Sequence, residues 1–233
     1  LSERATASLA SRRMDRIDAT MASIGDRSER ARAMATFDEL KRSRSDLSSR
    51  AMARFEQLAA MTNPAPDAIL NLGDMHLVAG NDTLAERHYR RYLDVAKGSV
   101  AGWDEMRRKA PDEIASKNEL ERTLATIEGK RKSAVDKTVR VLEHLAEIKY
   151  RRRNFQDAAA LLAEAIELDP NRHELHVPMA ECLVELDQDD EALKHLEIYL
   201  RRSQSFDASA RKATKMRAQV LDRIRASGSS EGL

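Results

Sequence analysis

Two histidines three residues apart, His173 and His176, have the spacing that could best support metal chemistry in this sequence. On a helix, residues at this spacing share one face, so both imidazoles could ligate one ion. A zinc site needs three or four ligands, and no third ligand accompanies this pair. We therefore interpret both histidines as surface residues at the start of a helix, and we expect no metal site.

Nucleophilic and acid–base chemistry also lacks its usual patterns. Cys182 is the single cysteine, which excludes an intramolecular disulfide, and its apolar neighbours predict a buried, inert thiol. Glycine-rich phosphate loops and H-E-x-x-H are absent. Carboxylate pairs such as Asp189-Asp190 are typical of solvated helix faces. We expect no catalytic residue and no cofactor, and hence a protein that is not an enzyme.

Basic clusters are a further candidate, because arginines lining one groove could hold phosphate. Lys and Arg total 40 against 39 Asp and Glu, so the chain lacks the basic excess of a nucleic-acid binder. Acidic residues interleave with the clusters, and pairing between residues four apart explains much of the pattern. We do not expect nucleic acid as a partner. The clusters lie at residues 12–13, 90–91, 107–109, 151–153 and 201–202.

The amino-acid composition predicts that the elements which position these side chains are helices. The 233 residues include 34% charged and only 4% aromatic residues, 8 glycines and 5 prolines. No apolar run is long enough to span a membrane. The first residue is Leu1, so we expect a fragment or a processed chain, in the cytoplasm or the periplasm. Richness in Ala and Arg suits a high-GC bacterium.

A repeat of 34 residues organises the C-terminal half. Ala158 and Ala192 are 34 residues apart, and their surroundings correspond. Apolar residues recur at steps of three and four, which predicts two amphipathic helices in each unit. An earlier stretch has the same form around Ala85. The corresponding positions are Ala85, Tyr89 and Tyr92; Ala158, Leu162 and Ala165; and Ala192, Leu196 and Tyr199.

These units resemble the tetratricopeptide repeat family. The period fits, as does a large residue before a small one in the first helix of each unit, at Leu72-Gly73, Leu145-Ala146 and Met179-Ala180. Pro170 closes one unit where the family commonly has proline. The resemblance covers 139–204 and 66–99, is weak over 32–65 and is absent over 100–138. It implies an all-α, right-handed superhelix of stacked helix-turn-helix units with a concave face.

The resulting expectation divides the chain into four parts. Residues 1–31 form a helical extension whose stripe, Leu9, Met14, Ile17, Met21 and Ile24, packs on the first repeat or dimerises as a coiled coil. Residues 32–204 form the array, 205–228 a capping helix and 229–233 a flexible tail. We expect units at about 32–65, 66–99, 139–172 and 173–204. Residues 100–138 form an atypical unit of two helices punctuated by Gly102, Pro111 and Gly129.

In the family, ligands commonly lie along the concave face made by the first helix of each unit. The resemblance therefore implies a mainly acidic binding face with apolar points, which favours a basic or amphipathic peptide or helix. The matching positions are Asp67, Leu70, Asp74, Leu77 and Val78; Arg140, Glu143, Glu147, Tyr150 and Arg151; and Glu174, Val177, Glu181, Val184 and Glu185.

The function predicted from this resemblance is a non-catalytic scaffold or adaptor for protein–protein interaction. Two alternatives stay open. One is a recruitment module cut from a larger, membrane or secretory, protein. The other is a self-assembling structural subunit, in which the N-terminal helices form a homo-oligomer.

Overall fold

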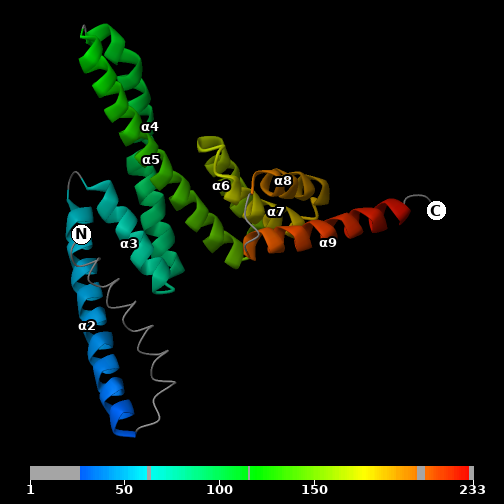
Figure 1. Ribbon diagram of the computed structural model, residues 1–233, viewed down its shortest axis with the longest axis horizontal. Helices are drawn as coiled ribbons and strands as arrows, with labels where there is room; N and C mark the ends of the chain where they lie inside the picture. The colour runs from blue at the N-terminus through cyan, green and yellow to red at the C-terminus, as the bar shows by residue number, and fades with distance from the viewer. Residues whose placement is uncertain (1–26, 62–63, 115, 204–207, 231–233) are drawn as a thin grey trace. The chain divides into compact units, whose positions relative to one another are not determined.

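The chain is all-α throughout the part that the structure describes. A computed structural model describes residues 27–61, 64–114, 116–203 and 208–230. Figure 1 shows its helices, and the described residues include no strand. Their bounds are α2 Arg27–Ala60, α3 Pro66–Val78, α4 Asp82–Glu113, α5 Lys117–Arg151, α6 Phe155–Leu168, the 3-10 helix η1 His173–Leu175, α7 His176–Glu185, α8 Asp189–Arg202 and α9 Ala208–Ser230. The all-α prediction is confirmed.

The chain divides into two compact units, the first ending at His88 and the second beginning at Tyr89, so that α4 runs across the division. In the first unit α2 packs on α3, and the start of α4 adds a stacked ring pair, His76 and His88, with centroids 5.3 Å apart. The core of this unit contains Ala51, Ala59, Ala68, Ile69, Leu70, Leu72, Gly73 and Ala85.

Residues 32–65 do not form the expected two-helix unit. They fall within and just after α2, which is a single helix that starts before residue 32. The physical reason lies in the sequence, because Arg27–Ala60 contains no Gly, Pro or Asn to end a helix. The expected stripe at residues 9–24 and most of the tail at 229–233 lie outside the described residues.

The second unit stacks its helices in chain order. Helix α5 packs on α6, α6 on α7, α7 on α8, and α8 on α9. One apolar cluster joins α5, α6, η1 and Cys182 of α7, and a second joins α7, α8 and α9. Helix α9 lies where the capping helix was predicted, and its Ala213, Met216, Val220 and Ile224 pack in or against this second cluster. The array therefore ends on a helix whose apolar face is covered by α7 and α8 and whose opposite face is exposed.

The repeat positions predicted from the 34-residue period are confirmed as core. Ala85, Ala158 and Ala192 are fully buried, and the bulky residues that follow them are buried as well. Gly73, Ala146 and Ala180 are buried in the first helices. Small residues here let neighbouring helices approach, and the large ones fill the space between them.

Three turns between paired helices share one backbone geometry. Gly80, Arg153 and Asp187 each have positive φ, at 74°, 61° and 57°. In each turn, the N–H of the next residue donates to a carbonyl five residues back, as from Asn154 to Lys149 and from Gln188 to Leu183. This hydrogen bond defines the Schellman motif that ends a helix. The same stop signal therefore sets the hairpin in all three helix pairs.

The segment 100–138 differs from the expected atypical unit. The breaks expected at Gly102 and Gly129 are absent, because α4 and α5 continue through both as long helices joined near residue 115 (Figure 1). A glycine inside a helix costs only about 1 kcal/mol, which cross-helix contacts can offset. Those contacts are Arg131 to Asp104 at 2.6 Å, Arg107 to Glu128 at 3.5 Å, and Lys130 over the Trp103 ring at 5.1 Å.

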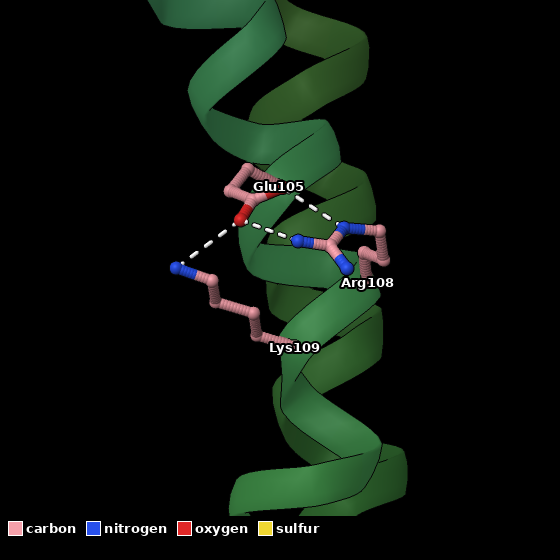
Figure 2. Close-up of polar contacts among 3 residues, drawn as sticks. All are labelled: Glu105, Arg108 and Lys109. Carbon is pink, nitrogen blue, oxygen red and sulfur yellow. Dashed lines mark hydrogen bonds and ion pairs between the residues drawn. The ribbon is translucent and has the colours of Figure 1, made fainter.

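The basic cluster at 107–109 lies on this helical hairpin and is neutralised within the chain. Figure 2 shows Glu105 between Arg108, which donates two hydrogen bonds to it, and Lys109 at 3.1 Å. These hydrogen bonds lower the pKa of the Glu105 carboxyl to about 2. The cluster is thus part of an ion-paired helix surface, as the interleaved charges predicted.

Candidate binding face

The first helices of the last two repeats bring one aromatic and two acidic side chains of the predicted face together. Tyr150 lies in the last turn of α5, and Glu181 and Glu185 lie one turn apart on α7. Burial raises the pKa of the Tyr150 hydroxyl, and the carboxylates of Glu181 and Glu185 raise it further. Tyr150 also packs against the apolar cluster that includes Cys182, the neighbour of Glu181 in the chain. We call Tyr150, Glu147, Glu181 and Glu185 the acidic face.

Two further carboxylates of the predicted face, Glu147 and Glu143, lie on α5. Glu147 precedes Tyr150 by three residues on the same side of the helix and accepts a hydrogen bond from Arg151 at 2.8 Å. Glu143, one turn earlier, lies 3.8 Å from Arg172. Both of these acidic side chains therefore have a cation of this chain beside them. Tyr150 also contacts Phe155 edge to face, at 5.2 Å between centroids, which fixes the ring against the start of α6.

Lys212 of α9 is a residue of this region that the sequence did not reveal. It forms an ion pair with Glu181, whose side chain is only 19% exposed. The pair joins residues 31 positions apart. No sequence signal could have found it, because it depends on how α9 packs beside α7.

Some predicted face residues are core residues instead. Leu70 on α3 and Val177 on α7 are buried at 3% and 7% exposure, and Val184 packs against the cluster shared with α9. The structure therefore assigns these three side chains to packing between helices. Of the other α3 positions, Asp67 is exposed, Asp74 and Leu77 are half-buried, and Val78 is 88% exposed.

Arg140 and Glu174, also predicted for the face, line a cavity of about 520 Å³. The cavity lies between the middle of α5 and the loop that leads into η1. Its charged lining is balanced, since Lys137, Arg140 and Arg172 stand against Asp136, Asp169 and Glu174, with Ser133, Asn171 and His173 completing it. The predicted face is thus balanced in charge near Arg140. Near Tyr150 three carboxylates, Glu147, Glu181 and Glu185, stand against the two cations Arg151 and Lys212.

The residues considered for catalysis or metal binding have structural positions. The prediction of a surface position is wrong for His176, which is buried because its ring packs against His195 of α8, with 2.7 Å between the two Nδ1 atoms. His173 stacks on Tyr199. Cys182 is 1% exposed, and burial raises its thiol pKa to about 11. Among the described residues, no three His, Cys, Asp or Glu side chains gather in a way that could hold a metal ion.

Helix pairs that recur along the chain and turn through the same Schellman geometry are typical of helical repeat proteins. Comparison with models of protein families identifies the same class of protein. Models described as tetratricopeptide repeat match residues 42–100 and 150–215, which together cover more than half of the chain. The chain belongs to the tetratricopeptide repeat family. No curated protein sequence matches the chain.

Solved structures of tetratricopeptide repeat proteins are similar at low identity. The P58(IPK) domain is 13% identical over 91% of this chain and 66% of its own, with a TM-score of 0.35. A protein of the thermophile Thermus thermophilus is 14% identical over 73% and 91%, also with 0.35. The domain of yeast Sti1 in complex with pHSP90 is 14% identical over 94% and 97%, with 0.34.

Membership of this family gives the general function. Tetratricopeptide repeat domains bind protein partners and are typically non-catalytic, and the comparisons found no catalytic domain in this chain. Within the described residues, no helix is both long enough and apolar enough to cross a bilayer.

Proposed function

We propose that the protein is a scaffold or adaptor whose acidic face binds a basic or amphipathic peptide or helix of a partner protein. The observation that carries the proposal is the packing of Tyr150 against the apolar cluster that includes Cys182, the α7 residue next to Glu181. The carboxylates of Glu181 and Glu185 act on the Tyr150 hydroxyl there and raise its pKa. An aromatic ring beside carboxylates suits a Lys or Arg side chain, because the ring contacts its apolar stem and the carboxylates attract its charge.

The exposed members of the face support the same chemistry. Glu147 and Glu185 are exposed, and Tyr150 is half-buried against Phe155 and therefore held in place. A rigid surface of this kind binds without paying the entropy of ordering itself. In the first unit, we propose that Asp67, Asp74 and Leu77 serve partner binding in their own repeat.

The test is a selection of random displayed peptides on the full chain. We expect enriched peptides to carry Lys or Arg next to apolar residues. A Glu147→Lys, Glu185→Lys double variant should bind them at least about tenfold more weakly, because each reversal replaces attraction by repulsion. Affinity should also fall with added salt.

The matched control is the double variant Glu121→Lys, Glu167→Lys, which changes the net charge equally at exposed positions of α5 and α6. It should bind as the wild type does, and both variants should keep the wild-type unfolding temperature. Enrichment of acidic peptides, or equal weakening by both double variants, would contradict the proposal.

A further inference from the structure

Two histidines of the last repeat face each other across α7 and α8. The Nδ1 atoms of His176 and His195 are 2.7 Å apart, and the ring centroids are 5.0 Å apart. His176 is the first residue of α7 and is 6% exposed, and His195 is half-buried in the middle of α8. The contact joins the two helices of this repeat at the point where α7 begins.

The geometry restricts the number of protons that the pair can hold. In the neutral pair, one Nδ1 carries a proton and donates it to the bare Nδ1 of the other ring. One added proton keeps this hydrogen bond, because an imidazolium can still donate to a neutral ring. A second added proton leaves two N–H groups pointing at each other, and the contact becomes repulsive.

We propose that the His176–His195 pair is an acid-sensitive switch: double protonation separates the start of α7 from α8 and loosens the last repeat. The proposal is independent of which partner the protein binds. Because His176 also begins the helix that carries Glu181 and Glu185, loosening there would reach the acidic face as well.

The surroundings of the pair favour the uncharged state. The pKa of His176 is lowered to about 4, chiefly by burial and also by the neighbouring His195, Arg202 and His173. Arg202 is held in place by donating to the carbonyl of Pro170 at 2.8 Å. Burial also lowers the pKa of His195, against the opposing influence of Glu191.

Glu191 is the one acidic side chain among the groups that change the pKa values of these two histidines. It forms an ion pair with Lys194, with 2.6 Å between Nζ and Oε1. The unfolded chain therefore takes up more protons than the folded one between about pH 6.5 and pH 4. The stability of this repeat should fall as the pH drops through that window.

The experiment follows the imidazole resonances of the full chain by NMR from pH 8 to pH 3.5, with amide hydrogen exchange at pH 7 and pH 4.5. We expect His176 and His195 to titrate as a coupled pair below the ordinary value of 6.5. Amide protection in α7 and α8 should fall at pH 4.5 at least about tenfold more than in the early turns of α5. Independent titration of both rings near pH 6.5, or equal loss of protection in all helices, would overturn the proposal.

Variants separate the pair from general acid effects. His195→Gln offers an amide oxygen that accepts from His176 whether or not that ring is charged, so the contact survives acid. Between pH 7.5 and 4.5, its unfolding temperature should fall at least about 3 °C less than that of the wild type. His144→Gln, which removes a histidine stacked on Tyr89, is the control and should follow the wild type. Equal pH dependence of wild type and His195→Gln would also refute the switch; if that variant does not fold, the wild-type titration decides.

Discussion

Arg153 and Asp187 occupy the same left-handed position in two successive repeats, 34 residues apart, with φ of 61° and 57°. Gly80 takes this position in the earlier helix pair, with φ of 74°. Left-handed backbone is costly for residues with a Cβ atom and nearly free for glycine. In two of the three turns, the left-handed residue therefore carries a Cβ atom, which makes this backbone conformation unfavourable.

The first prediction concerns these turns. Arg153→Gly should stabilise the protein by about 0.5–1 kcal/mol, because it relieves the left-handed strain. Gly80→Ala should destabilise it by about 1 kcal/mol, since alanine is strained there although the space around it is open. Chemical denaturation measures both. Asp187→Gly combines two effects on stability, because it also removes a hydrogen bond of 2.6 Å that Arg223 donates to Asp187. If Gly80→Ala were neutral, the shared turn geometry would be wrong.

The second prediction concerns the long helices α4 and α5. Gly102 and Gly129 lie inside helices, and a Cβ atom at either would meet nothing within 4 Å. Gly102→Ala and Gly129→Ala should each stabilise the protein by about 0.5–1 kcal/mol, because alanine loses less backbone entropy in a helix. Thermal unfolding checks this, with helix content followed by circular dichroism. Destabilisation by both changes would instead indicate helix breaks at these glycines.

The third prediction tests the repeat core. Leu162 is 2% exposed and belongs to the cluster joining α5, α6 and α7, whereas the adjacent Leu161 is half-buried. Leu162→Ala should cost about 2–5 kcal/mol, because it leaves a cavity between packed helices. Leu161→Ala is the matched control and should cost less than half as much. Equal costs in urea denaturation would mean that the assigned face of α6 is incorrect.

The fourth prediction concerns the thiol of Cys182. Burial and the nearby carboxylates of Glu181 and Glu185 raise its pKa from 9.0 to about 11, which leaves about a hundredth of the ordinary thiolate. A thiol reagent at pH 8 should therefore modify the native protein at least about a hundredfold more slowly than the protein unfolded in urea. The absorbance of the released product measures both rates. Similar rates would show that the end of α7 opens readily.

Much of the fold could be predicted because the repeat is local. The spacing of Ala158 and Ala192 gives the phase of the helices, and helical periodicity then tells which side chains meet the neighbouring helix. This logic correctly placed Leu162 and Leu196 in the core. It failed at Gly102 and Gly129. A glycine inside a helix costs only about 1 kcal/mol, which is less than the stabilisation that the two long helices gain by packing together.

The candidate site was less predictable. Leu70 and Val177 lie at the edge of the predicted face, where a small rotation of a helix decides between partner contact and core. The sequence cannot supply that rotation, because it depends on how the neighbouring helices pack.

The repeat period, the last two helix pairs and the repeat positions in their core, such as Ala158 and Leu196, follow from the amino-acid sequence alone, because they depend on spacing within one or two turns of helix. Which side chains of different helices meet depends on how those helices pack in three dimensions. The contacts of Lys212 with Glu181 and of His176 with His195 join residues 31 and 19 positions apart. They exist because α9 and α8 pack against α7, and no local pattern specifies an approach of that kind.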